Sequence, residues 1–176
     1  MPEREQFWSQ PPDWESAKVS ADGVAISVAP TARILQLSGR IDALLASCGI
    51  AAALGPRDVC DAARYALRLA PASVLLVSAG PLDCPAGWVD DRTAVSDLSA
   101  GMLCFDLCGK RADDIMALGA EYDFASRGAL PLESSRLRFA GLRIAVCRRP
   151  DGWRLHVERP WAPALWSWLA ARVGAG

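Results

Sequence analysis

His156 is the single imidazole of the chain, so it is the side chain available to activate a serine or cysteine nucleophile. Such catalysis needs the base within hydrogen-bond reach of the nucleophile and held in place by a third group. Leu155 and Val157 flank the histidine in an apolar run of strand character. This setting favours a structural histidine in a sheet over a general base.

Two pairs of adjacent carboxylates, Asp90-Asp91 and Asp113-Asp114, could also support acid and base chemistry. Adjacent residues point in different directions, so neither pair forms a facing dyad. Both pairs flank expected starts of helices or strands, where solvent and the helix dipole favour negative charge. We assign them to solvation and capping, and no residue of the chain is predicted to be catalytic.

Six cysteines could form disulfides or bind a metal; they are Cys48, Cys60, Cys84, Cys104, Cys108 and Cys147. Cys104 and Cys108 lie four residues apart in a strand-like run and would share a side of it. A structural zinc site needs four thiolate or imidazole ligands, and no second pair at ligand spacing follows. We therefore expect reduced core thiols and no metal site.

A glycine followed by a basic residue occurs twice, as Gly39-Arg40 and Gly109-Lys110, each time between strand-like and helix-forming sequence. A phosphate loop would need more glycines and a hydroxyl after the lysine, and a dinucleotide site would need GxGxxG. The two glycines are better explained as sharp corners from strand to helix. No cofactor is expected in this chain.

The same order of elements surrounds both corners. Strand-like runs lead into them at 34–37 and 103–107, helix-forming sequence follows at 41–46 and 112–118, and two more strand-like runs come next, at 65–69 with 74–78 and at 142–147 with 153–157. Further strand-like runs at 24–28 and 93–98 precede the two repeats. Each is expected to form a hairpin with the strand that follows it.

These patterns predict an α+β fold of two pseudo-repeated β-α-β-β halves, with antiparallel sheets and packed helices. The halves cover about 23–80 and 92–176 of one domain, 23–176, and a loop at 81–91 lies between them. Residues 1–22, which hold two tryptophans and three prolines, form an aromatic and proline-rich N-terminal extension.

Seven tryptophans in a chain of this size point to contacts with a partner, because exposed indole rings are otherwise unfavourable. A terminal helix is predicted at 161–172, with Trp161, Leu165, Trp168 and Leu169 sharing one face and Trp166 falling off it. The predicted partner-contacting residues belong to no clear core stripe; they are Trp8, Trp14, Trp88 and Trp166.

The composition excludes some function classes. A net charge of -1 provides no field to hold a nucleic-acid backbone or an anionic membrane surface. No apolar stretch approaches the roughly 20 residues needed to span a bilayer, and the polar first residues do not resemble a secretory signal. We therefore expect a cytoplasmic protein that binds neither nucleic acid nor membranes.

The second half resembles a known family in the order of four stretches. The run 94–99 leads into 103–109, a helix follows at 112–119, and Trp153-Arg154-Leu155-His156-Val157 precedes a final helix that contains alanine and tryptophan. This order resembles the gamma subunit of heterotetrameric sarcosine oxidase. The first half agrees more loosely, through 23–39 and 67–77.

The resemblance implies a small α+β subunit similar to part of the folate-binding domain of aminomethyltransferases. Its partners would be a large alpha subunit that binds NAD and tetrahydrofolate, a beta subunit that carries FAD and FMN, and a small delta subunit. The complex oxidises the N-methyl group of sarcosine and releases glycine and hydrogen peroxide. The gamma subunit is non-catalytic, and we expect this chain to dock on the large folate-domain subunit.

The sequence departs from the family pattern between Gly119 and Leu132, so a related N-methyl amine or amino acid is an equally compatible substrate. A different class of function is a stand-alone folate-binding or one-carbon transfer protein. That function would need an acidic residue to grip the pterin, and the candidates are Asp97, Glu121 and Asp123.

Overall fold

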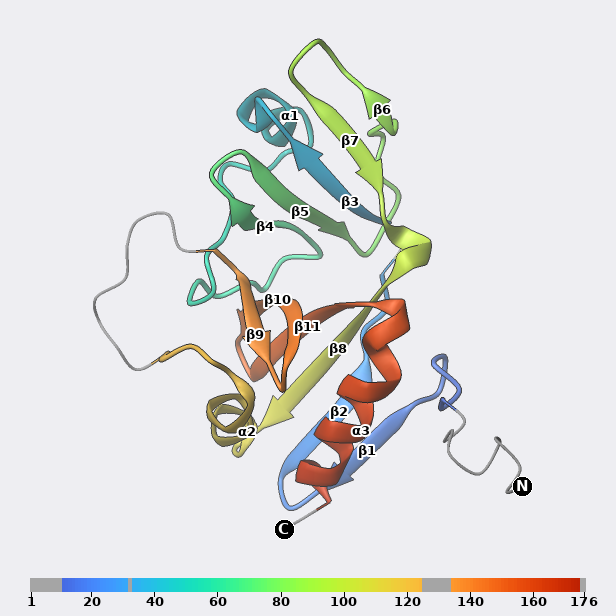
Figure 1. Ribbon diagram of the computed structural model, residues 1–176, viewed down its shortest axis with the longest axis vertical. Helices are drawn as coiled ribbons and strands as arrows, with labels where there is room; N and C mark the ends of the chain where they lie inside the picture. Colours follow the sequence, from blue (N-terminus) through green and yellow to red (C-terminus); the bar gives the residue numbers. More distant parts are fainter. Residues whose placement is uncertain (1–10, 32, 125–133, 175–176) are drawn as a thin grey trace, which may run out of the picture.

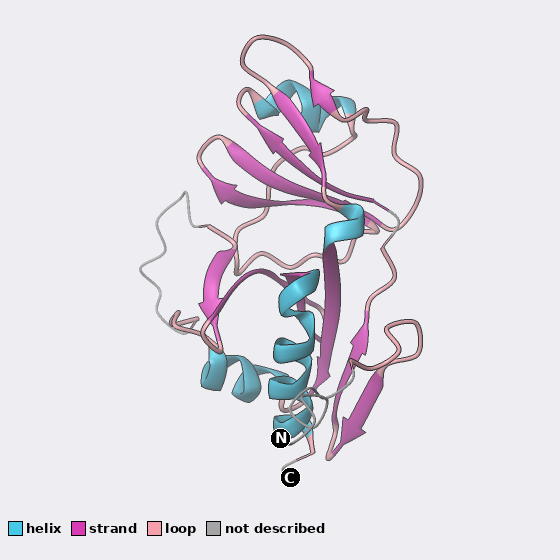
Figure 2. Cartoon of the chain, turned by 45° about the vertical axis from the view of Figure 1, so that its right-hand side comes forward, coloured by secondary structure: helices cyan, strands magenta, loops and turns pink. Residues whose placement is uncertain are grey.

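The computed structural model describes residues 11–31, 33–124 and 134–174. These residues form two antiparallel sheets that pack against each other, with α1 at one end of the molecule and α2 and α3 at the other (Figure 1 and Figure 2). The predicted α+β class, with antiparallel sheets and packed helices, is confirmed. Within the described part of the chain, no helix is long and apolar enough to cross a membrane.

The sheets have the following strands and helices. Sheet A has the order β1 (Lys18–Ala21), β2 (Val24–Val28), β8 (Met102–Gly109), β11 (Gly152–Glu158), β10 (Leu142–Arg149) and β9 (Arg136–Phe139). Sheet B has the order β4 (Arg64–Ala70), β5 (Ser73–Ser78), β3 (Arg33–Ser38), β7 (Ala94–Asp97) and β6 (Gly87–Trp88). The helices are α1 (Ile41–Ser47), α2 (Ala112–Gly119) and α3 (Ala162–Val173), with short 3-10 turns η2 (Ser99–Gly101) and η3 (Arg159–Trp161).

The strand period of two sorts the apolar residues into layers. One face of each sheet points into the layer between the two sheets. This inter-sheet layer includes Ile34, Tyr65, Leu67, Leu75, Cys104, Ala145 and Cys147. The alternate residues of β3, Leu35 and Leu37, face the opposite way and pack with Ile41 and Leu45 of α1. The outer face of sheet A is covered in the same way by α2 and α3. In cross-section, the layers of the fold therefore follow the order helix, sheet, sheet, helix.

The first strand of each half pairs with the sheet of the other half. β2 pairs with β8 and not with β3, whereas β7 pairs with β3 and not with β8. The two predicted hairpins are therefore wrong, because an alternating pattern specifies which face of a strand is buried but not which strand lies beside it. The orders β2-β8-β11-β10 and β7-β3-β5-β4 are equivalent, so the two halves are related and exchange their leading strands.

The two glycine corners lie where the exchanged strands begin. Gly39 and Gly109 have φ of +102° and +115°, and each packs against backbone just before the other half's leading strand. A Cβ atom at Gly39 would lie 1.7 Å from the carbonyl oxygen of Arg92, and one at Gly109 would lie 2.1 Å from that of Gly23. The interpretation as strand-to-helix corners is confirmed, and the corners require glycine for both conformation and space.

The N-terminal boundary of the fold does not coincide with residue 22. Lys18–Ala21 is strand β1, which pairs with β2 through a turn at Asp22 and Gly23, where φ is +46° and +76°. Trp14 packs against the core of sheet A. The described part of the predicted 1–22 extension thus includes the edge strand of sheet A and a tryptophan that covers the core of this sheet. The sequence did not predict the strand, because four residues are too few to show a clear period.

The buried face of the terminal helix differs from the predicted one. Helix α3 begins at Ala162, and its buried residues are Ala162, Leu165, Trp166, Leu169 and Val173. These positions follow the three-and-four spacing of one helical face. Trp161, which belongs to η3, is 52% exposed. The prediction that Trp161 is buried and Trp166 faces outward is wrong, because the choice between two overlapping apolar stripes depends on how the helix is rotated against sheet A.

Substituting either corner glycine by alanine is expected to lower the free energy of unfolding by about 3 kcal/mol or more, since it adds a backbone clash to a strained φ. Gly141→Ala is the matched control: its φ is +79°, but no atom lies within 4 Å of the added Cβ. It should cost only about 1 kcal/mol. Urea unfolding of the three variants measures the difference, and equal losses at Gly39, Gly109 and Gly141 would contradict this account.

Candidate functional site

His156 lies between the two sheets and is fully buried. Its Nδ1 is 3.1 Å from the carbonyl oxygen of Ala145, and its Nε2 is 2.8 Å from the hydroxyl of Tyr65 on β4. Because a carbonyl can only accept, Nδ1 carries the proton, and Nε2 accepts from Tyr65. Burial lowers the pKa of His156 to about 4 and raises that of Tyr65. Both ring nitrogens are engaged, which confirms a structural histidine.

An ion pair lies beside this histidine. Arg154 on β11 is directly opposite Asp106 on β8 and donates two hydrogen bonds to its carboxylate, at 2.6 and 2.7 Å. The two side chains are only 11% and 20% exposed. A partly buried pair of this geometry satisfies both charges. In the inter-sheet layer, the side chains of Tyr65, His156, Asp106 and Arg154 are thus all engaged in hydrogen bonds.

The stability of the protein should fall as the pH decreases from about 6.5 to about 4, because the unfolded chain protonates His156 in this window and the folded chain does not. The contribution is at most about 1.4 kcal/mol per pH unit, and it is fully retained above pH 6.5. Carboxylates add their own pH dependence, so the comparison needs a reference variant.

The double variant His156→Leu with Tyr65→Phe removes the histidine together with the hydroxyl group that donates to its Nε2, so that this hydroxyl is not left without its partner. Urea unfolding of this variant and of the unmodified protein at several pH values between 4 and 7 isolates the histidine. As the pH decreases, the free energy of unfolding of the unmodified protein should fall more steeply than that of the double variant. Parallel pH profiles would show that His156 does not contribute in this way.

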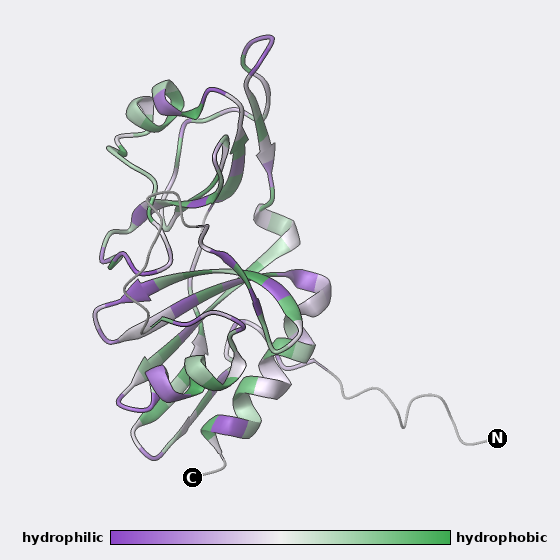
Figure 3. Cartoon of the chain, turned by 60° about the vertical axis from the view of Figure 1, so that its left-hand side comes forward, coloured by the Kyte–Doolittle hydropathy of each residue, from purple (hydrophilic) through white to green (hydrophobic). Residues whose placement is uncertain are grey.

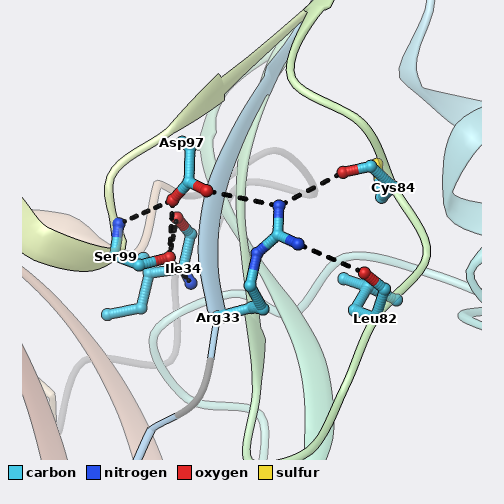
Figure 4. A network of polar contacts seen from close by, with 6 residues as sticks. All are labelled: Arg33, Ile34, Leu82, Cys84, Asp97 and Ser99. Atoms are coloured by element: carbon cyan, nitrogen blue, oxygen red, sulfur yellow. Dashed lines mark hydrogen bonds and ion pairs between the residues drawn. The ribbon is translucent and has the colours of Figure 1, made fainter.

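Asp97 is occupied by contacts at the crossing from sheet B to sheet A (Figure 4). Its carboxylate accepts hydrogen bonds from the backbone N–H and hydroxyl of Ser99, at 2.9 and 2.6 Å, and pairs with Arg33 at 3.3 Å. The guanidinium of Arg33 also donates to the carbonyls of Leu82 and Cys84. The Ser99 hydrogen bonds lower the pKa of Asp97. The side chain joins β7 to its neighbours and has little capacity left for a pterin.

Glu121 and Asp123 come together at a cavity of about 680 Å³ beside α2. The aromatic rings of Tyr122, Phe124 and Trp153 also line it. Glu121 pairs with Arg138 on β9, at 3.6 Å. The structure therefore groups two of the three predicted acidic residues and leaves Asp97 on sheet B.

The first aspartate of each pair has structural partners, nearby in the chain for Asp90 and distant in the chain for Asp113. Asp90 accepts a hydrogen bond from the backbone N–H of Arg92 in a turn, which lowers its pKa. Asp113 lies in the first turn of α2 and accepts from Arg148 and from the indole N–H of Trp153. Arg148 is the larger cause of the lowered Asp113 pKa. Neither pair forms a facing dyad, in agreement with the sequence analysis.

The cysteines are free thiols, and all except the half-buried Cys108 are buried, as predicted. Cys60 lies 3.8 Å from a guanidinium nitrogen of Arg149. The thiol of Cys147, as hydrogen-bond donor, lowers the pKa of Cys60 to about 7, and Arg149 contributes less. No group of three or more cysteine, histidine or acidic residues that could hold a metal occurs in the part of the chain that the structure describes.

A second cavity, the inter-sheet cleft, was not anticipated. It has a volume of about 460 Å³ and lies between the sheets; its lining includes Gln36, Leu69, Leu75, Leu98, Met102, Arg136, Arg143, Ala145, His156 and Glu158. These residues come from strands of both sheets and from the segment that joins β7 to β8. The sequence carries no signal for this cleft, because its lining residues are brought together only when the two sheets pack against each other.

Two exposed apolar side chains are adjacent at the edge of sheet B. Trp88 and Val89 are 79% and 52% exposed in the hairpin of β6 and β7, at the edge of sheet B (Figure 1). The turn that follows, which contains Asp90 and Asp91, is hydrophilic (Figure 3). Trp161 is the other exposed tryptophan in the described residues.

The other predicted contact residues differ from Trp88. Trp166 is 8% exposed and packs against Trp14 and Phe105, with ring centroids 5.9 and 5.5 Å apart. It belongs to the core of sheet A, so the assignment of Trp166 to an outer surface is corrected. Trp14 is half-buried on the same core. Trp8 lies outside the described residues.

Trp166→Ala should therefore lower the free energy of unfolding by about 3–5 kcal/mol, the usual cost of removing a buried indole. Trp88→Ala, which removes the same side chain from an exposed position, should change it by less than about 0.5 kcal/mol. Urea unfolding of both variants tests the assignment. A large loss of unfolding free energy in Trp88→Ala, or no loss in Trp166→Ala, would contradict the assignment of Trp166 to the core and Trp88 to the surface.

No protein-family model matches the chain, and no curated protein matches it significantly. Among solved structures, the fold is similar to a chain of the heterotetrameric sarcosine oxidase from Corynebacterium sp. U-96, solved in complex with pyrrole 2-carboxylate. The TM-score is 0.67 at 19% sequence identity, over 89% of this chain and 87% of that chain. The resemblance drawn from the sequence is thus confirmed at the level of the fold, which this chain shares with a chain of heterotetrameric sarcosine oxidase.

Proposed function

We propose that the chain is a non-catalytic subunit of a heteromeric flavin-dependent oxidase that acts on sarcosine or on a related N-methyl amine or amino acid. The observation that carries this proposal is the shared fold, which extends over nearly the whole of this chain and of its structural neighbour. The resemblance in sequence order points to the gamma subunit. The chain would be cytoplasmic, like the enzyme it serves.

The assembly would contain a large alpha-type subunit, a beta subunit and a delta subunit. Its FAD, FMN, NAD and tetrahydrofolate would be carried by these partners. The polar groups of this chain support the proposal that the cofactors and the catalytic residues belong to the partner subunits. His156 uses both ring nitrogens in structural hydrogen bonds, and the carboxylates of Asp97 and Asp106 are paired with arginines.

The docking surface would centre on the β6–β7 hairpin. A two-residue edge strand with an exposed indole offers both a large apolar contact and unpaired backbone groups along its outer side. Trp88 is the proposed anchor, with Val89 beside it. Trp8 and the exposed part of Trp14 are candidates for a further contact, whereas Trp166 is retained by the core of this chain.

Trp88→Ala should weaken binding to the large subunit about tenfold or more, because a buried tryptophan at the centre of an interface is worth about 2 kcal/mol or more. Leu118→Ala, which removes another exposed apolar side chain, on α2, is the control and should leave the affinity unchanged. Binding is measured by biolayer interferometry with the co-expressed partners, after urea unfolding confirms that both variants are folded.

The full chain, affinity-purified from its native host, should elute in a larger assembly with flavin absorbance. Recovery of the chain alone, monodisperse at low concentration, would contradict the proposal. If the assembly forms but Trp88→Ala does not weaken it, the subunit assignment stands and the docking surface is elsewhere.

A stand-alone folate-binding or one-carbon transfer protein is the second candidate function. It is favoured by the joint position of Glu121 and Asp123 on one cavity with three aromatic rings. A fluorescence titration with a reduced folate separates the two functions. Saturable micromolar binding by the isolated chain, lost in Glu121→Gln, would support the second candidate and count against the first.

A further inference from the structure

The inter-sheet cleft combines an apolar wall with two charged side chains on one hairpin. Leu69 and Leu75 of sheet B face Ala145 of sheet A across it, and Arg136 and Arg143 project from β9 and β10. Its volume of about 460 Å³ lies within the range of about 300–1,000 Å³ of small-molecule sites. The cleft is therefore large enough for a small organic ligand.

The two arginines have no acidic partner among the described residues. Arg136 is opposite Ala145, and Arg143 is directly opposite Arg138 in the β9–β10 ladder. Like charges placed directly opposite each other destabilise a sheet. Arg138 is relieved by its ion pair with Glu121, but the described residues provide no such ion pair for Arg143. This arrangement favours an anion on the cleft side of the hairpin.

The remaining polar groups set the charge of that anion. His156 forms part of the lining, but both its nitrogens are engaged and burial keeps it neutral at pH 7. Glu158, two residues along β11 from His156, also lines the cleft and contributes one negative charge. Two guanidinium groups and one carboxylate leave a net charge of +1. A ligand with a single negative charge and an apolar body matches both the charge and the wall.

The cavity beside α2 offers less to a ligand. Arg148 already lies over the ring of Trp153, 4.8 Å from its centroid, and Arg57 lies over that of Tyr122. The carboxylate of Asp113 is held by Arg148 as well. The faces of Trp153 and Tyr122 and the Asp113 carboxylate already have partners within the chain, whereas Arg136 and Arg143 form no ion pair in the part of the chain that the structure describes.

We propose that the inter-sheet cleft binds a small organic monocarboxylate, with its carboxylate at Arg136 and Arg143 and its apolar body against Leu69, Leu75 and Ala145. Bidentate guanidinium–carboxylate hydrogen bonds would provide the polar contact. Burial of the apolar body between the two sheets would provide the rest of the affinity. The site requires no partner subunit and is independent of the function proposed above.

The test uses the isolated full chain and hexanoate as the probe, with hexanamide as a neutral analogue of similar shape. In two-dimensional amide NMR spectra, hexanoate should cause saturable shifts centred on Leu98, Ala145 and His156. Hexanamide should bind at least tenfold more weakly. Because this comparison uses only the unmodified protein, it stands even if a variant fails to fold.

Arg143→Gln and Arg136→Gln should each weaken hexanoate binding about tenfold, since each removes a charged hydrogen bond. Arg40→Gln, at the start of α1, is the matched control and should change binding less than twofold. Equal binding of hexanoate and hexanamide would overturn the proposal. So would shifts centred on Phe124 and the other cavity, an absence of saturable shifts, or unchanged binding in both cleft variants.

Discussion

The close approach of backbone at Gly39 and Gly109 is the constraint on which the rest of the structure depends. At each corner, the chain turns from strand to helix directly against the backbone that begins the other half's leading strand. Only glycine combines the required positive φ with the absence of a side chain. This contact places β2 beside β8 and β7 beside β3, so each half completes the sheet of the other. The two sheets therefore form one interlocked unit.

The packing of the two sheets explains why the polar groups of the inter-sheet layer are structural. It brings Tyr65 of sheet B to His156 of sheet A, and Asp106 and Arg154 pair beside them on neighbouring strands of sheet A. A paired polar group in a layer of low dielectric stabilises one alignment of the sheets, because any shift would leave it unpaired. The inter-sheet cleft adjoins this layer, and there Arg136 and Arg143 form no ion pair with any other described residue. Paired and unpaired charges thus separate a structural region from a candidate binding region.

Tryptophan residues occur both in the core of sheet A and on the surface of the molecule. Trp166 and Trp14 pack edge to face in the core of sheet A, whereas Trp88 stands exposed on a short edge strand. An indole ring in contact with water is unfavourable unless another surface covers it. Under the proposed function, a partner subunit would cover this ring, since subunit interfaces bury apolar side chains that are exposed in the isolated chain.

The amino-acid sequence by itself determined the local structure. The periods of the apolar residues predicted the helices and the longer strands but not the short strands β1, β6 and β9, and the two glycine–basic pairs located the corners and the repeat. The structural character of His156 followed from its apolar neighbours. The tertiary structure decided which strands are neighbours, how α3 is rotated, and which side chains meet in the cavities. These choices depend on contacts between residues far apart in the chain, and a period of two or of 3.6 residues carries no information about them.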